Sequence, residues 1–357
     1  MNQTITIKVK LNPTNEQIKL IDNGSLDYIK TINELVSEMV IDKKTTNKTS
    51  ASVITPLNSA VKNQAIKDAK SVFKKAKKSK YKIIPVLKKP VIVWNNQNYT
   101  IKGNNISMPF IIDGKSKKIE IKADLNNDIF DTLSNAKLGT LRVTKKGRKY
   151  IAQISITLNI EPKTNGQVMG VDLGILIPAV ATTQNGKVKF FGNGRQNKYY
   201  RRYYKTKRAK LSKAKKLNAI INMNNKEQRY MHNQDHKISR DIVNFAKENN
   251  VSVIRLECLE GISKTTRTSR KNKKNLHDWS FYRLSIYIEY KANLEGIRVE
   301  YVNPKYTSQT CPKCGERHKA NGRSYFCKDC GFRTHRDLVG AKNIINATVI
   351  DGRSLSA

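Results

Sequence analysis

Four cysteines near the end of the printed sequence constrain the fold more than any other feature. Cys311 and Cys314 form one C-x2-C pair, and Cys327 and Cys330 form a second pair after twelve intervening residues. Four thiolates at this spacing make the closed tetrahedral set of a structural Zn²⁺ site, which has no open position for catalysis. We therefore predict a zinc ribbon that staples a loop lacking its own core, with a redox dithiol pair as the alternative.

An acid, Asp337, follows the last cysteine by seven positions, in GFRTHRDLVGAKNI. The apolar spacing predicts a helix over 336–347 with Asp337 in its first turn, where the helix dipole favours an acid anyway. Two more acids end apolar strands: Asp172 in QVMGVDLGILIP and Glu257 in VSVIRLE. Each has an ordinary explanation, as a turn residue or a surface residue, and Glu260 is an alternative to Glu257.

Convergence of the three carboxylates would change that interpretation. If the two strands are neighbours, their ends lie side by side and the last helix brings its N-terminus to the same edge. Converging carboxylates repel one another unless hard cations lie between them, and Mg²⁺ or Mn²⁺ binds such oxygen ligands. Two ions roughly 4 Å apart can activate water and stabilise the leaving oxygen in phosphodiester cleavage. Spacing alone does not decide between this metal site and three unrelated acids.

The charge of the chain indicates a polyanionic partner. Lys and Arg number 68 against 28 Asp and Glu, a formal net charge of +40. A nucleic acid backbone offsets this self-repulsion and releases counterions on binding. The sequence has no apolar run long enough to span a membrane, so we expect no membrane partner. The start, MNQTITIKVKLNP, resembles no secretory signal, and the cysteine pattern suits a reducing compartment, so we expect a cytoplasmic, nucleoid-associated protein.

The N-terminal part reads as strands with a helical insertion. Short alternating runs in 1–10 and 80–160, separated by Asn, Gly and Lys, predict a small antiparallel sheet or β-barrel. The segment 11–79 between them predicts two helices. Thr14 and Gln17 have the spacing of a capping box at the first helix start.

An α/β pattern follows the predicted linker at 161–166. Three strands, a long helical stretch, a strand, a helix, a strand and a helix give the order of a ribonuclease-H-like domain. We expect the strands and helices at 167–173, 178–184, 187–191, 197–223, 227–249, 251–257, 277–295 and 297–303. The predicted nuclease domain is 166–305 with 335–350, interrupted by the ribbon at 306–334 and followed by a tail at 351–357.

These residues resemble the TnpB family, the transposon-encoded RNA-guided nucleases, and the compact type V CRISPR effectors descended from them. The resemblance is carried by GVDLGI around Asp172, by the strand ending at Glu257, and by TSQTCPKCG and RDLVGAKNI within 306–344. It covers nearly the whole chain and is strongest over 166–347. One departure is Cys258, where the family often has Asp.

The resemblance implies a RuvC-like nuclease whose catalytic, Mg²⁺-binding acids are Asp172, Glu257 and Asp337. It also implies a guide RNA derived from the transposon end and a double-stranded DNA target with a short adjacent motif. In such proteins base pairing with the guide RNA recognises the target sequence, while the protein recognises the backbone and the shape of the RNA–DNA duplex. The alternatives are a nuclease-inactive RNA-guided repressor, a transposase that joins DNA ends, and a CRISPR-associated effector of the same fold.

Basic stretches are candidates for nucleic acid contacts, although charge runs are often only solvated faces. The segment 195–216 has eleven basic residues, four tyrosines and no acid, and tyrosines can stack on bases. We predict that it contacts the RNA–DNA heteroduplex, while 264–274 admits the strand to be cut. The specific candidates are Lys74, Lys75, Arg201, Arg202, Tyr203, Lys205, Lys207, Arg208, Arg267 and Arg270.

Overall fold

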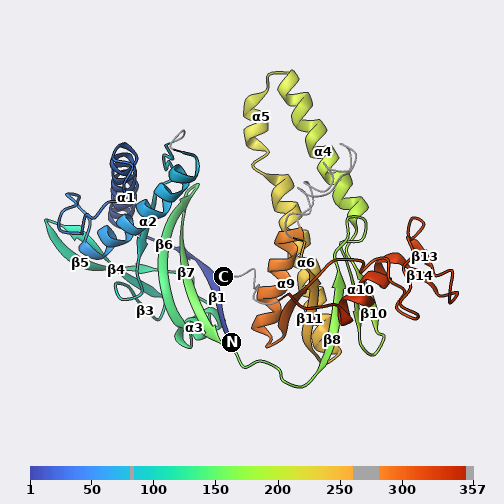
Figure 1. Cartoon of the computed structure of the whole chain (residues 1–357). Helices are drawn as coiled ribbons and strands as arrows, with labels where there is room; N and C mark the ends of the chain where they lie inside the picture. Colours follow the sequence, from blue (N-terminus) through green and yellow to red (C-terminus); the bar gives the residue numbers. More distant parts are fainter. Residues whose placement is uncertain (81–83, 260–280, 351–357) are drawn as a thin grey trace. The chain divides into compact units, whose positions relative to one another are not determined.

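The computed structural model describes residues 1–80, 84–259 and 281–350. The chain divides into two compact units, one spanning Asn2–Asn159 and the other running from Ile160 onward together with Met1 (Figure 1). Arg267, Arg270, Glu260 and the predicted tail lie outside the described residues.

Four antiparallel strands form the larger sheet of the first unit, in the order β1-β7-β6-β2. β1 pairs with β7 along its whole length, from Asn2 opposite Asn159 to Leu11 opposite Tyr150. The first strand of the unit is thus held by the last one, and all other elements of the unit lie between them in sequence. The bounds are β1 Asn2–Leu11, β2 Val91–Trp94, β6 Lys137–Lys146 and β7 Lys149–Asn159.

A smaller sheet has the order β3-β4-β5, with β3 at Thr100–Lys102, β4 at Asn105–Ile112 and β5 at Lys115–Lys122. It meets β1 at a bridge between Leu11 and Ala123. The described strands therefore form two sheets, and a closed barrel stays a prediction. The short helix α3, Asn127–Ser134, was missed in the sequence; the Asn126 side chain caps it by accepting from the Ile129 amide.

Two helices, α1 (Asn15–Ile41) and α2 (Ser59–Lys78), pack on these sheets. The predicted capping box is confirmed: the Thr14 hydroxyl accepts from the Gln17 amide, and the Gln17 side chain accepts from the Thr14 amide. Ala65, Ala69 and Phe73 of α2 are buried. They belong to one hydrophobic core, to which both helices and both sheets contribute residues.

A mixed five-stranded sheet forms the centre of the second unit, in the order β10-β9-β8-β11-β12. β8, β9 and β10 are antiparallel neighbours, whereas β8, β11 and β12 are parallel. All the strands predicted around this sheet are present, with ends shifted by at most a few residues. Their bounds are β8 Gln167–Asp172, β9 Ala179–Thr183, β10 Val188–Phe191, β11 Val251–Glu257 and β12 Arg298–Val302.

Helices cover both faces of this sheet. α6 (Lys226–Glu248) and α9 (Phe281–Leu294) pack against one face in the core that contains Met169 and Val171 of β8. α10 (Arg336–Asn346) packs against β8 and β9 (Figure 1). Because side chains alternate along a strand, Gly170 and Asp172 share the opposite face, toward α10.

The predicted single helix over 197–223 is wrong in one respect. α4 (Gly194–Lys213) ends before Lys215, whose φ of +53° is left-handed, and the short α5 (Leu217–Asn222) follows. A lysine in this conformation interrupts the helical hydrogen-bond ladder. Asn224 and Asn225 also have positive φ, and they turn the chain into α6.

The cysteine segment forms a small module around a two-stranded hairpin, β13 (Ser324–Phe326) and β14 (Arg333–His335). Its core is formed by Cys311, Tyr325, Cys327 and Val339. Val339 belongs to α10, so the ribbon shares its few buried side chains with the helix that carries Asp337.

Candidate active site

Neighbouring parallel strands bring Asp172 and Glu257 to one edge of the sheet. Leu256 of β11 lies opposite Val171 of β8, so the residues that end the two strands are adjacent in register. Leu256 faces the core with α6 and α9, so Glu257 points to the opposite face. Arg255, on that same face, donates from Nη1 to the carbonyl oxygen of Ile345 in α10.

The last helix reaches the same place because two glycines allow close packing. A Cβ at Gly170 would lie 2.1 Å from the carbonyl oxygen of Ala341, and a Cβ at Gly340 would lie 2.8 Å from Oδ2 of Asp172. Asp337, one helical turn earlier, is 7% exposed. A Cβ at Gly174, two residues after Asp172, would lie 3.9 Å from Oδ2 of Asp337. The three predicted acids therefore converge.

Their electrostatics show the effect of this convergence. The pKa of Asp172 is raised well above its usual value, first by burial and then by the negative charges of Glu257 and Asp337. Burial also raises the pKa of Glu257, and a hydrogen bond from the Thr307 hydroxyl opposes that shift. Ionising these groups together is unfavourable unless positive charge is brought between them.

Arg323 supplies one positive charge that the sequence did not reveal. Its Nη1 donates to both carboxylate oxygens of Asp337, at 2.7 Å each. Arg323 belongs to the ribbon, immediately before β13, so the contact joins the ribbon to the candidate site. We found no sequence signal for it, because the residue stands among many other basic side chains.

The donor set fits hard divalent cations. Three acidic side chains offer only oxygen atoms, which Mg²⁺ and Mn²⁺ prefer. The described clusters whose ligand atoms all lie within 4.8 Å of one another contain cysteines, and the three carboxylates are more widely spread than that. A cation that binds to Asp337 would compete with Arg323 for its carboxylate.

The four cysteines come together as predicted. Their sulfur atoms all lie within 4.8 Å of one another, with 3.6 Å between Cys311 and Cys330 and 3.4 Å between Cys314 and Cys327. A tetrahedron with Zn–S bonds of about 2.3 Å has S···S edges of about 3.8 Å. The cluster therefore fits a structural zinc ion.

Two histidines near the ribbon have structural partners. His335 is the N-cap of α10, and its Nδ1 accepts from the backbone N–H of Asp337 at 3.3 Å. His318 pairs through Nε2 with Oδ2 of Asp329 at 2.5 Å. His335 thus helps to place Asp337, a role that no motif indicated.

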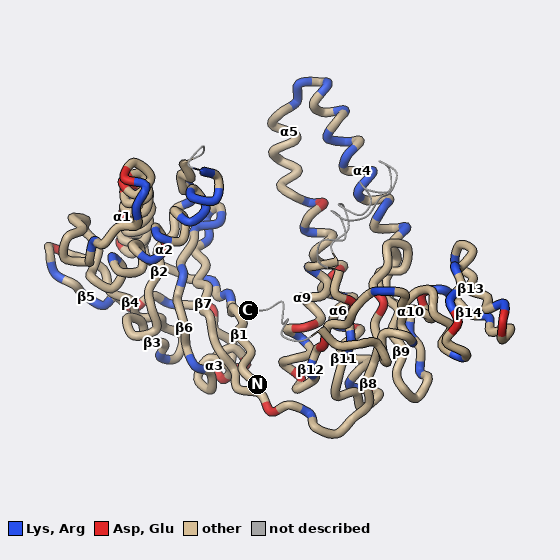
Figure 2. The backbone as a smooth tube through the Cα atoms, in the orientation of Figure 1, with Lys and Arg blue, Asp and Glu red and all other residues tan. Residues whose placement is uncertain are grey.

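The candidates that the structure describes lie on α2 and α4, and all of them except the half-buried Arg201 are exposed. Figure 2 shows Lys and Arg following α4 along its length and gathering at the C-terminal half of α2. Tyr199 and Tyr203 on α4 are 63% and 45% exposed, and Lys207 lies over the Tyr203 ring. Arg208 is paired with Glu227 at 2.6 Å. Lys74 and Lys75 are exposed on α2.

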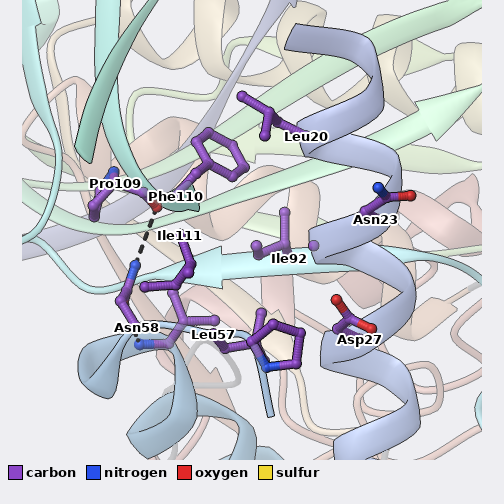
Figure 3. Close-up of a pocket in the computed structure, with 12 residues that line it drawn as sticks. Leu20, Asn23, Asp27, Leu57, Asn58, Ile92, Pro109, Phe110 and Ile111 are labelled. Atoms are coloured by element: carbon purple, nitrogen blue, oxygen red, sulfur yellow. Dashed lines mark hydrogen bonds between the residues drawn. The ribbon is translucent and has the colours of Figure 1, made fainter. Parts of the chain in front are cut away.

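The first unit contains a pocket of about 230 Å³ between α1, the start of α2, β2 and β4. Figure 3 shows Leu57, Ile92 and Phe110 on its walls, and Asn23 and Asp27 on α1. None of the predicted site residues lines it.

Comparison with known proteins shows which families this chain resembles. The family described as Cas12f1-like, TNB domain, matches residues 281–344. A CRISPR-associated endodeoxyribonuclease Cas12f1 of Sulfoacidibacillus thermotolerans is 27% identical over 218 residues, 55% of this chain and 50% of that protein. A TnpB-like protein of Methanocaldococcus jannaschii is 36% identical over 121 residues, 33% of this chain and 43% of that protein.

A solved structure shares the fold across almost the whole chain. The cryo-EM structure of a Cas12f1–sgRNA–target DNA complex contains a chain with TM-score 0.70 and 16% identity. The match covers 98% of this chain and 99% of that one. By contrast, this chain spans about half the length of the first curated relatives it matches.

The fold places the chain in the structural class of the Cas12f1 chain in that complex, and the cysteine ribbon lies within the segment that the family model matches. Within that class the chain belongs to the TnpB family. The sequence-based family assignment is thereby confirmed. Across the described residues, no helix is long and apolar enough to cross a membrane.

Proposed function

We propose that the chain is an RNA-guided DNA endonuclease that hydrolyses target phosphodiesters at one RuvC-like, ribonuclease-H-like site. The observation that carries the proposal is the convergence of Asp172, Glu257 and Asp337 on one face of a mixed sheet. Three clustered acids with few compensating cations suit a reaction that needs divalent metal ions.

Asp172, Glu257 and Asp337 would hold Mg²⁺ or Mn²⁺, and Cys311, Cys314, Cys327 and Cys330 would hold Zn²⁺. When bound, a pair of hard cations at the carboxylates supplies an activated water and a stabilised leaving oxygen. The carboxyls must give up their protons for this binding, and the raised pKa of Asp172 makes that step dependent on pH. Arg323 holds the Asp337 side chain in place before cations arrive.

The partners in this proposal are a guide RNA made from the transposon end and double-stranded DNA with a short adjacent motif. The net charge of +40 and the exposed tyrosines of α4 support nucleic acid binding. Within it, α4 contacts the heteroduplex, and Lys74 and Lys75 on α2 lie near the adjacent motif. The strand-admitting role of Arg267 and Arg270 remains a prediction, as does a cytoplasmic, nucleoid-associated location.

The test has two parts. Purification from the host followed by sequencing of the bound RNA should yield a discrete RNA, and a heterogeneous RNA population would contradict guided recognition. The loaded protein should then cut matched DNA in Mg²⁺, whereas Asp172→Asn, Glu257→Gln and Asp337→Asn should bind the same RNA and leave DNA intact. Full cutting by any of the three variants would refute the site.

Binding and joining assays, together with the sequence that flanks the gene, distinguish the alternative functions. Guided DNA binding without cutting by the parent protein would identify a repressor, and joining of labelled transposon ends would identify a transposase. A repeat array beside the gene, in place of a transposon, would identify a CRISPR-associated effector.

A further inference from the structure

Two short motifs contain polar residues whose roles neither the zinc cluster nor the three acids explain. TSQT precedes Cys311, and NI ends the segment RDLVGAKNI. The structure brings Thr307 of the first motif and Asn343 of the second into contact beside Glu257.

Thr307 contacts Glu257 directly. Its hydroxyl donates to Oε1 of Glu257 and also lies 3.1 Å from the carbonyl oxygen of Pro304. A hydroxyl has one proton, and an ionised carboxylate is the stronger acceptor, so the bond to Glu257 prevails when that acid is charged. Thr307 is 6% exposed, so little water competes for the bond.

The bond restricts how Glu257 can present its oxygens. Glu257 is the last residue of β11, and a free glutamate side chain loses considerable rotamer entropy when it is fixed. With Oε1 engaged by Thr307, Oε2 has no hydrogen-bond partner among the residues described. One oxygen is therefore held by the protein, and the other is available to a cation.

Asn343 fixes Thr307 in turn. Its Nδ2 donates to the carbonyl oxygens of Thr307 and Thr310, at 2.7 Å each. These two bonds use both protons of the amide. The turn between them is also closed internally, because the amides of Gln309 and Thr310 both donate to the carbonyl oxygen of Tyr306.

Helix α10 thus positions two of the three acids. It carries Asp337 in its first turn, and six residues later it carries Asn343, about 9 Å further along the axis. Asn343 holds the turn that bears Thr307, and Thr307 holds Glu257. A displacement of α10 would therefore move the third acid directly and release the second through the turn.

We propose that Thr307 is a positioning residue for Glu257, anchored by Asn343, and that it sets the affinity of the three-acid site for divalent cations. This inference rests on the proposed function, because it concerns the same site. Outer partners that orient a metal ligand typically change affinity or activity by about 10–100-fold.

The experiment measures Mn²⁺ binding by calorimetry on the full-length, zinc-loaded protein, with Asp172→Asn defining the signal that belongs to the acids. Thr307→Val should raise the Mn²⁺ dissociation constant by about tenfold or more. Thr307→Ser keeps the hydroxyl and should stay near the parent value. Thr310→Val is the matched control, because within the described part of the chain its hydroxyl bonds to the Tyr306 carbonyl oxygen of the same turn and to no acid.

Cleavage supplies a second measurement. In Thr307→Val the Mg²⁺ concentration for half-maximal cutting should rise by the same factor, and the rate at saturating Mg²⁺ should fall less. Parent-like Mn²⁺ binding in Thr307→Val would overturn the inference, as would an equal loss in Thr310→Val, which would point to general loosening of the turn. A parent protein whose Mn²⁺ signal is unchanged by Asp172→Asn would overturn the proposed function as well.

Discussion

Nη1 of Arg323 lies 2.7 Å from both carboxylate oxygens of Asp337, across the hairpin of the cysteine ribbon. The Asp337 side chain is 9% exposed and that of Arg323 is 39% exposed, so the pair is desolvated mainly on the acid side. Together with Thr307 and Glu257, it gives the ribbon a direct contact with two of the three acids. The ribbon therefore does more than close the connection between β12 and α10.

Replacing Arg323 by Met should destabilise the protein when no Mg²⁺ is added. The change leaves the buried Asp337 carboxylate without its cation, and we expect a loss of about 1–2 kcal/mol after allowing for the exposure of Arg323. Added Mg²⁺ should recover part of this loss, since the cation neutralises the same carboxylate. Denaturant unfolding with and without Mg²⁺ measures both effects.

Lys319→Met is the control for charge alone, because Lys319 is an exposed cation of the same ribbon. It should change stability little under either condition. A loss in Arg323→Met that is independent of Mg²⁺ would show that the arginine and the cation do not share Asp337.

Gly340→Ala should reduce DNA cutting while leaving the stability of the protein close to that of the parent. Alanine favours the helix interior over glycine by roughly 0.5–1 kcal/mol, which offsets part of any packing strain. The new Cβ would lie 2.8 Å from Oδ2 of Asp172, so that side chain must move. We expect unfolding close to that of the parent but cutting reduced by about a hundredfold, as for an acid displaced by about 1 Å.

Asn346→Ala, at the exposed end of the same helix, is the matched control and should cut normally. If Gly340→Ala also cut at the parent rate, the close approach of α10 to Asp172 would not matter for activity.

Cys327→Ser should abolish zinc binding and, through it, cutting. Cys327 is fully buried in the small ribbon core, and removing one thiolate opens the tetrahedral set. The ribbon should then become sensitive to protease within 306–334. The contacts of Thr307 with Glu257 and of Arg323 with Asp337 should be lost. Metal analysis and limited proteolysis measure these effects, and Cys258→Ser, outside the cluster, should retain its zinc.

Retention of stoichiometric zinc by Cys327→Ser would show that another ligand completes the site. His318 and Asp329 lie close enough to Cys327 for such a replacement.

The sequence predicted the parts of the site that depend on local pattern. Asp172 and Glu257 end apolar strands, and the cysteine spacing fixes the ligand cluster, so both could be found without coordinates. The break at Lys215 was missed because its left-handed φ is not encoded by a glycine. The helix α3 was missed because it has only two turns and three apolar residues, Ile129, Phe130 and Leu133, too few to establish a period.

The contacts that orient the acids could not be predicted. Arg323 and Thr307 stand within a basic, polar stretch, and only the folded ribbon brings them to Asp337 and Glu257. Gly170 and Gly340 matter because a helix and a strand approach closely there, which is a property of packing between distant segments. Local periodicity carries no information about such contacts.

Lys291 makes the stability of the second unit depend on pH. It is 4% exposed between α9 and α6, with Nζ 2.6 Å from the His236 carbonyl oxygen and 2.6 Å from Oγ of Ser239. Burial, and then the charge of Arg240, lowers its pKa from 10.5 to about 8. Between these two values the unfolded chain binds more protons than the folded one, so this lysine's contribution to stability rises with pH.

Lys291→Met removes that dependence. Relative to the variant, the parent should gain stability from pH about 8 to pH about 10, by at most about 1.4 kcal/mol per pH unit, with no change below this window. Denaturant unfolding of both proteins across this range gives the difference, in which the contributions of the other basic side chains cancel. A difference that stays constant with pH would show that Lys291 remains charged in the fold, held by the two oxygen acceptors against the effect of burial.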